Sequence, residues 1–284
     1  MPIERITVLG AGTMGHGIAQ LAAVAHYRVT LHDVAPERIE AGLRAIRGSL
    51  EKMVDKGKLE PEARSEALGR IEAGPDLARA VAQADLVVEA APESLALKRD
   101  IFTALGAHAP EGAVLATNTS SLPVTEIAGM ATHPGRVVGM HFFNPPQVLE
   151  LLEIVRAVQT TDETVALVRE VGRRMGKTTI LVNDSAGFAT SRLGVVIAAE
   201  AMRMLETGVA SAEDIDTAMK LGYRHPMGPL ELTDHVGLDV RLAVLEHLHR
   251  EVGEQFRPPQ ILRQLVRAGK LGKKTGEGFY KWPR

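Results

Sequence analysis

The sequence predicts an α/β fold in which a doubly wound parallel sheet is followed by an all-α C-terminal domain. Short runs rich in Val, Ile and Leu alternate with helical stretches in the first half of the 284 residues, whereas no convincing strand follows Gly187. Strands that alternate with helices pair in parallel and are covered on both faces. The predicted strands are residues 5–9, 28–32, 85–89, 113–117, 137–141, 151–155 and 178–182.

The segment 36–70 is too long for one ordinary crossover helix. Apolar residues recur at helical spacing over 37–54, Gly57 interrupts the pattern, and it resumes over 61–68. This pattern predicts a helical hairpin that projects from the sheet. We place the domain boundary near Asp184–Gly187, which gives domains 1–185 and 186–284. Helices are predicted in the second domain at 187–207, 211–221, 228–252 and 259–268, with Ser211 as a helix cap.

Composition excludes several classes of protein. The formal net charge of −2 argues against nonspecific binding of nucleic acid, and the absence of cysteine excludes disulfides and thiolate sites. The N-terminus lacks a signal pattern, and no apolar run approaches the roughly 20 residues that span a bilayer. We therefore expect a cytoplasmic protein without a membrane partner. His247 and His249 have no ligand spacing to other metal-type groups, so we expect no metal.

The first predicted strand leads into a glycine-rich turn, Gly10-x-Gly12-x-x-Gly15, and then into a helix. A second strand ends at Asp33, 18 residues after Gly15. A strand, this turn, a helix and a distal carboxylate form the Rossmann-type dinucleotide site, whose helix N-terminus binds the pyrophosphate. Asp33 should accept hydrogen bonds from the ribose and favour NAD over NADP. The other turn residues expected to contact the cofactor are Thr13 and Met14. The alternative is a structural turn with a helix-capping Asp.

A second pattern pairs His141 with Glu153. Glu153 interrupts the apolar run 151–155, and a carboxylate in a buried strand requires a partner. A His oriented by a buried carboxylate is a general base that works near neutral pH. On spacing alone, a core His and a solvent-facing Glu at a strand edge explain the pattern better, and the other motifs of the chain favour the catalytic pair.

With these features the chain resembles the 3-hydroxyacyl-CoA dehydrogenase family, in particular its short-chain, monofunctional 3-hydroxybutyryl-CoA members. The resemblance covers nearly the whole chain, and its most specific motifs are Asn118-Thr-Ser-Ser121 and His141-Phe-Phe-Asn-Pro145. It implies reversible, NAD-dependent oxidation of an (S)-3-hydroxyacyl-CoA, with 3-hydroxybutyryl-CoA as the expected substrate. The family belongs to fatty-acid metabolism, including β-oxidation. The resemblance also implies a homodimer through the C-terminal domain and a substrate cleft between the domains.

The resemblance assigns roles to individual residues. His141 matches the catalytic base, Glu153 the carboxylate that orients it, and Ser120 the serine that bonds the substrate oxygen near the nicotinamide. Cofactor-contacting positions fall on Glu93, Lys98, Asn144 and Lys274. Coenzyme A would contact Ser49 and Lys56 on the projecting hairpin.

One position departs from the family pattern. Ser191 stands where the family often has an active-site Asn, which puts the catalytic role of this position in doubt. Two other functions stay open. A dehydrogenase of a free hydroxy acid or sugar acid could use the same plan without coenzyme A. A non-catalytic dinucleotide-binding protein could also have this fold, because a fold does not determine a function.

Overall fold

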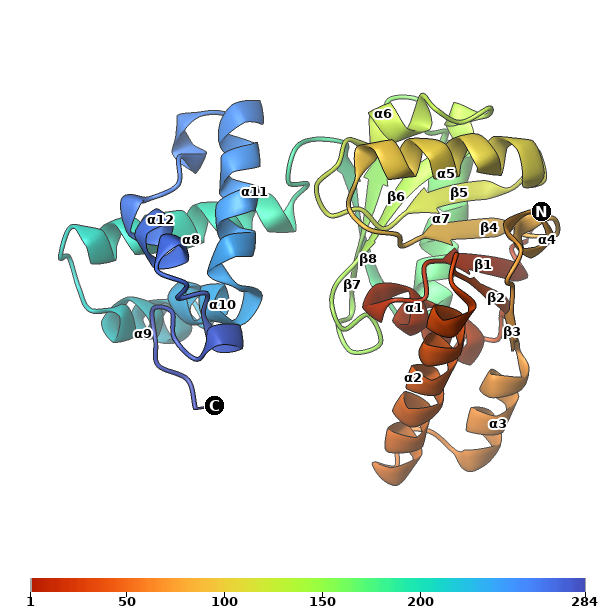
Figure 1. Cartoon of the computed structure of the whole chain (residues 1–284), viewed down its shortest axis with the longest axis horizontal. Helices are drawn as coiled ribbons and strands as arrows, with labels where there is room; N and C mark the ends of the chain where they lie inside the picture. Colours follow the sequence, from red (N-terminus) through yellow and green to blue (C-terminus); the bar gives the residue numbers. More distant parts are fainter. Residues whose placement is uncertain (1, 284) are drawn as a thin grey trace. The chain divides into compact units, whose positions relative to one another are not determined.

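The computed structural model describes residues 2–283, which form two compact units (Figure 1). The N-terminal unit ends at Asp184, and the C-terminal unit begins at Ser185. The N-terminal unit contains an eight-stranded sheet. Its strands are β1 (Arg5–Leu9), β2 (Arg28–His32), β3 (Ile71–Ala73), β4 (Leu86–Glu89), β5 (Val114–Thr117), β6 (Val137–Phe142), β7 (Leu151–Arg156) and β8 (Thr178–Asn183).

The strand order is β3-β2-β1-β4-β5-β6-β7-β8, so the chain reverses its direction of travel across the sheet between β1 and β4. This is the topological switch point at which doubly wound sheets bind ligands. The structure confirms the predicted fold class, with two differences. The short edge strand β3 was not expected, and β7 runs antiparallel to β6, although every other neighbouring pair is parallel.

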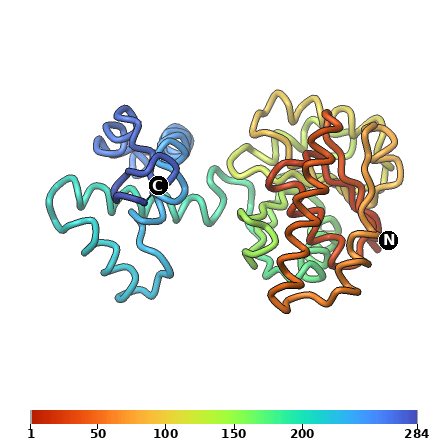
Figure 2. Tube along the Cα trace, turned by 60° about the horizontal axis from the view of Figure 1, so that its bottom comes forward, coloured from red at the N-terminus to blue at the C-terminus, as the bar shows by residue number. Residues whose placement is uncertain are grey.

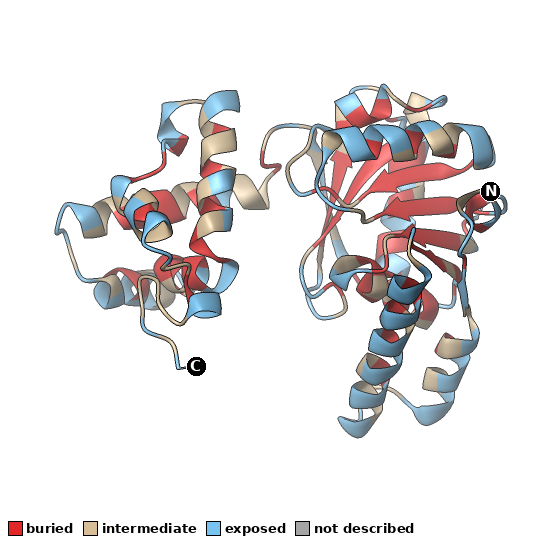
Figure 3. Ribbon diagram, viewed as in Figure 1, coloured by how far each residue is buried: buried red, intermediate tan, exposed pale blue. Residues whose placement is uncertain are grey.

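Helices cover both faces of the sheet. On one face α1 (Thr13–Val24) and α7 (Asp162–Arg174) share a hydrophobic core with alternate strand residues such as Val8, Val88 and Met140. The other face carries α4 (Leu77–Val81), α5 (Leu95–His108) and α6 (Val124–Ala128). Figure 3 shows the central strands buried between these layers. Burial on both faces explains why the central strands β4, β5 and β6 are nearly continuous apolar runs.

The predicted hairpin consists of α2 (Pro36–Asp55) and α3 (Pro61–Gly69). The two helices lie side by side in both views and extend away from the strands in Figure 1 (Figures 1 and 2). Proline at the first position of each helix suits its start, because the missing N–H would have no partner within the helix. Only Ile39, Gly42, Ile46 and Leu50 of α2 are buried, and the charged residues of this helix are exposed to solvent.

The C-terminal unit is helical, with α8 (Thr190–Glu206), α9 (Ala212–Gly222), α10 (Pro229–Val236), α11 (Leu238–Glu251) and α12 (Gln260–Arg267). Ser211 caps α9 as predicted, since its hydroxyl accepts from the Asp214 N–H. The single helix predicted over 228–252 was wrong, because Gly237, at φ +104°, separates α10 from α11. Among the described residues no helix combines the length and apolar character needed to cross a membrane.

Candidate active site and dinucleotide site

The glycine turn after β1 is held tightly by the backbone. Gly10 has φ +96°, a conformation that favours glycine, and its N–H donates to the His32 carbonyl at 2.8 Å. A Cβ on Gly15 would lie 1.6 Å from the Gly10 carbonyl oxygen, so only glycine permits this approach of α1 to the turn. A Cβ on Gly12 would meet nothing within 4 Å. Packing within the chain therefore does not require glycine at position 12, whereas close approach of a dinucleotide does.

Asp33 joins β2 to this turn. Its carboxylate accepts from the Ala11 N–H at 2.9 Å and from the Ala35 N–H at 3.3 Å, and the residue is only 7% exposed. Asp33 therefore holds the turn, but it caps no helix, since the N-cap residues are Gly12 for α1 and Ala35 for α2. Each carboxylate oxygen has a second lone pair, so the same group can also accept from ribose hydroxyls. The Arg38 guanidinium lies 4.0 Å from Asp33.

A cavity of about 670 Å³ opens beside the turn. Its lining comes from the carboxyl ends of β1, β2 and β4 and from the first residues of α1, and it includes Gly10, Gly12, Thr13, Met14 and Asp33. Most of the exposed lining is apolar, contributed by residues such as Val34, Pro92 and Ile101. The cavity lies at the switch point, and its residues fit the adenosine half of a dinucleotide.

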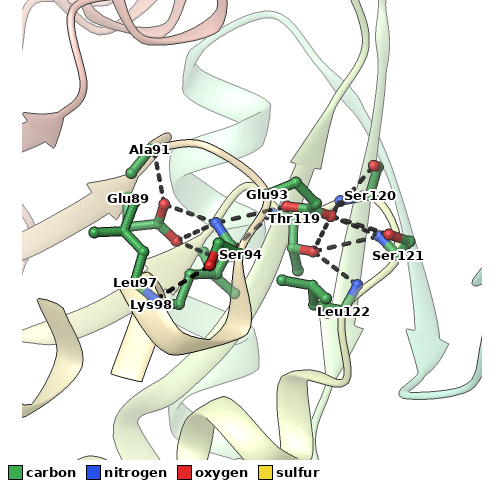
Figure 4. A network of polar contacts seen from close by, with 11 residues as sticks. Glu89, Ala91, Glu93, Ser94, Leu97, Lys98, Thr119, Ser120, Ser121 and Leu122 are labelled. Atoms are coloured by element: carbon green, nitrogen blue, oxygen red, sulfur yellow. Dashed lines mark hydrogen bonds and ion pairs between the residues drawn. The ribbon is translucent and has the colours of Figure 1, made fainter. Parts of the chain in front are cut away.

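A buried network holds the chain after β4 and β5 (Figure 4). Lys98 is 1% exposed, and its Nζ donates to both oxygens of Glu89 at 2.7 and 2.8 Å. Glu89 also accepts from the Ala91 N–H and the Thr117 hydroxyl, each at 2.7 Å. Lys98 therefore fixes the Glu89 carboxylate, which in turn binds the backbone N–H of the turn after β4. The sequence reasoning missed Glu89, although a carboxylate that ends a buried strand shortly before a helical Lys is a usable signal.

Glu93 is the second carboxylate of this network. One of its oxygens accepts from the Thr119 hydroxyl at 2.6 Å and from the N–H groups of Ser120 and Ser121 at 3.0 and 3.1 Å. Burial alone would raise the pKa of Glu93, but the hydrogen bond from Thr119, the Lys98 charge and the other donors together lower it below the ordinary 4.5. The ionised Glu93 thus fixes the turn that presents the exposed Ser120.

His141 and Glu153 lie directly opposite each other on β6 and β7. The distance from His141 Nδ1 to Glu153 Oε2 is 2.7 Å, with His141 6% exposed and Glu153 fully buried. Both side chains are on the sheet face opposite to Met140 and Ile154, which pack in the core with α7. The pair therefore has the geometry of an imidazole oriented by a carboxylate.

The loop after β6 carries Asn144, which is exposed and precedes Pro145. Lys177 holds this loop: its buried Nζ donates to the carbonyls of Pro146 and Leu149 at 2.6 and 2.7 Å. Burial lowers the pKa of Lys177, and the Glu150 charge partly opposes this effect. No sequence pattern identified Lys177, because the carbonyls that it binds belong to a different segment.

The remaining predicted site residues lie elsewhere. Ser49 is half-buried on α2, and Lys56 is exposed at its C-terminal end. In the C-terminal unit, Ser191 is half-buried in the first turn of α8. Lys274 in the same unit forms an ion pair with Asp239, at 2.6 and 2.7 Å to its two oxygens. Within residues 2–283 no group of three or more acidic, His or Cys side chains could hold a metal ion.

Both units match known proteins. The family model described as "3-hydroxyacyl-CoA dehydrogenase, NAD binding domain" matches residues 5–185, and the one described as "3-hydroxyacyl-CoA dehydrogenase, C-terminal domain" matches residues 187–282. A "Probable 3-hydroxybutyryl-CoA dehydrogenase" of Bacillus subtilis is 45% identical over 284 residues, covering 99% of this chain and 98% of the relative. A "3-hydroxybutyryl-CoA dehydrogenase" of Bradyrhizobium diazoefficiens is 40% identical over 281 residues, covering 99% and 96%. The crystal structure of the (S)-3-hydroxybutyryl-CoA dehydrogenase PaaH1 from Ralstonia eutropha has a TM-score of 0.96 and 39% identity, covering 99% of this chain and all of that one.

Proposed function

Because the chain belongs to the 3-hydroxyacyl-CoA dehydrogenase family and is an NAD-dependent enzyme of that kind, we propose that it interconverts (S)-3-hydroxybutyryl-CoA and acetoacetyl-CoA. The observation that carries the proposal is the buried contact of 2.7 Å between His141 and Glu153. We place this step in fatty-acid metabolism, including β-oxidation, in the cytoplasm.

Glu153 accepts a hydrogen bond from the Nδ1–H of His141. This bond selects the imidazole tautomer whose lone pair is on Nε2. In this proposal Nε2 removes the proton from the substrate 3-hydroxyl. The buried carboxylate then stabilises the imidazolium that forms. NAD, when bound, supplies the acceptor for the hydride that leaves C3. Proton transfer by a positioned base of this kind contributes about 10²–10⁴-fold to the rate.

The residues around this pair have supporting roles in the proposal. Ser120 donates to the substrate oxygen, and its turn is fixed by Glu93. Asn144 lies on the loop that Lys177 holds and contacts the cofactor. Lys274 contributes to cofactor binding, and Ser191 donates to the substrate in place of the longer Asn.

The α2–α3 hairpin is proposed as the coenzyme A contact, through Ser49 and Lys56. Lys52, Lys56 and Lys58 are exposed, and no carboxylate among residues 2–283 forms an ion pair with any of them. They are therefore available to phosphates.

We also propose that the enzyme is a homodimer through the C-terminal unit. Large apolar side chains are exposed there, including Leu193, Leu221 and Tyr223. In this proposal the partner chain removes these apolar side chains from water.

The test is NADH oxidation with acetoacetyl-CoA, run beside free acetoacetate at equal concentration. Rapid turnover with the thioester alone supports the proposal, whereas turnover with acetoacetate alone would favour a free-acid dehydrogenase.

His141→Ala should lower kcat by orders of magnitude and leave NADH binding nearly intact. Glu153→Gln should lower kcat and change its pH profile, and an unchanged profile would leave Glu153 with a structural role only.

A further inference from the structure

A second hollow lies near the amino ends of the strands, whereas the dinucleotide cavity lies at their carboxyl ends. It has a volume of about 360 Å³ and lies beside the amino ends of β1 and β2, where the strands begin at Arg5 and Arg28. The residues assigned to the dehydrogenase reaction lie outside its lining, which comes from β1, β2, the start of β3 and α4. The hollow therefore requires a separate explanation.

The fold leaves this part of the sheet open. Arg5 pairs with Arg28 and Thr7 with Thr30, so all four side chains lie on one face of the sheet. The five-residue helix α4 packs on this face here, and its Ala80 carbonyl accepts a hydrogen bond from the Thr7 hydroxyl. A helix this short leaves the first residues of both strands uncovered.

The side chains around the hollow are strongly cationic. Arg5, Arg28, Arg70 and Arg79 line it, and Glu72 is the only carboxylate in the lining. Arg70 forms an ion pair with Glu66, and Glu72 accepts from the Thr30 hydroxyl. Within residues 2–283 the other three guanidinium groups form no ion pair, and Arg5 instead donates to the neutral amide oxygen of Gln83. Three arginines without carboxylate partners thus border one cavity.

We propose that this hollow binds a small phosphate-bearing anion between the guanidinium groups of Arg5, Arg28 and Arg79. Planar guanidinium groups bind phosphate oxygens in pairs, and three of them offer more donors than one phosphate can use. The volume exceeds that of a lone phosphate group, so an organic phosphate fits as well as an inorganic one.

The experiment is calorimetric titration of the whole enzyme with inorganic pyrophosphate and, separately, with glycerol 3-phosphate. Saturating NAD is present, so that the glycine turn does not bind the probe. The variant Arg28→Gln/Arg79→Gln removes two exposed side chains of the hollow. Arg169→Gln controls for the loss of an exposed arginine outside the hollow, since Arg169 is exposed on α7 and forms no ion pair among the described residues. Lys56→Gln reports on any binding of the probe at the hairpin.

We expect binding of at least one probe, weakened about tenfold or more in the double variant because charge-assisted hydrogen bonds are lost. Affinity should be unchanged in Arg169→Gln and Lys56→Gln, and the tighter probe identifies the source of the phosphate. Absence of binding, equal affinity in the double variant, or an equal loss in Arg169→Gln would overturn the proposal. NADH affinity and turnover of acetoacetyl-CoA are measured on the same variants. A failure of the proposed reaction would show in those assays for the unsubstituted enzyme and would leave the titration result standing.

Discussion

Gly12 and Gly15 allow cofactor binding to be separated from folding within one turn. Alanine at position 12 adds a methyl group that meets nothing within 4 Å. Alanine at position 15 places its Cβ 1.6 Å from the Gly10 carbonyl oxygen. We therefore expect Gly12→Ala to weaken NADH binding in a folded protein and Gly15→Ala to destabilise the N-terminal unit.

The expected magnitudes follow from the geometry. Real Cβ atoms essentially never approach within 3.0 Å, so the Gly10 carbonyl must retreat by at least 3.0 − 1.6 = 1.4 Å. It cannot do so freely, because the Gly10 N–H is bonded to His32. Overpacking of this kind costs about 1–3 kcal/mol or more. At about 2–4 °C per kcal/mol, Tm should fall by roughly 2–12 °C. Gly12→Ala should cost at most about 1 kcal/mol, the scale of a helix-cap effect.

The assay combines thermal unfolding with NADH fluorescence titration of both variants and the unsubstituted enzyme. Gly12→Ala should retain Tm to within about 4 °C and bind NADH at least tenfold more weakly. NADH binding by Gly12→Ala at the original affinity would refute the assignment of this turn to the pyrophosphate. An unchanged Tm in Gly15→Ala would refute the packing argument.

Three further predictions concern charged side chains. Lys98→Met should cost about 3–5 kcal/mol by leaving Glu89 uncompensated, and adding Glu89→Gln should recover part of that loss in urea denaturation; additive losses would contradict the pairing. Because the pKa of Glu93 is lowered in the folded state, its stabilising contribution is present above the ordinary value of 4.5 and is lost as pH falls through the lowered pKa. Glu93→Gln should therefore lose less stability between pH 6 and pH 3 than the unsubstituted enzyme, and equal losses in the two proteins would count against this reasoning. Arg241 is 8% exposed, forms no ion pair within residues 2–283, and has its pKa lowered to about 10 by burial. Arg241→Met should raise stability by about 1 kcal/mol or more, as measured by Tm, and a lower Tm would mean that the guanidinium has an acceptor outside the described chain.

The sequence predicted the strands of the N-terminal unit well, because strands buried on both faces are continuous apolar runs. The glycine turn could also be predicted, because its three glycines lie between a strand and a helix. Strand β3 was missed because Ile71–Ala73 has three residues and two of them are exposed. The break between α10 and α11 at Gly237 was not predicted, because the helical spacing of apolar residues continues on both sides of it.

The contacts within the site could not be predicted from spacing. A separation of twelve positions from His141 to Glu153 is compatible with many arrangements, and only the antiparallel register of β7 places the two side chains opposite each other. The bond from Lys98 to Glu89 likewise depends on how α5 lies under the end of β4. Lys177 binds carbonyls about thirty residues earlier in the chain, and main-chain acceptors leave no trace in the sequence.

The pairing of β6 with β7 limits how this enzyme can vary. Side chains alternate between the two faces of a sheet, so a shift of one residue in β7 would send Glu153 to the face that packs on α7. The connecting loop, residues 143–150, can lengthen or shorten without that penalty as long as the strand register is kept. Insertions there should therefore be tolerated where they spare Asn144 and the Pro146 and Leu149 carbonyls that Lys177 binds, whereas a single-residue deletion within Leu151–Arg156 should abolish turnover even if the protein still folds.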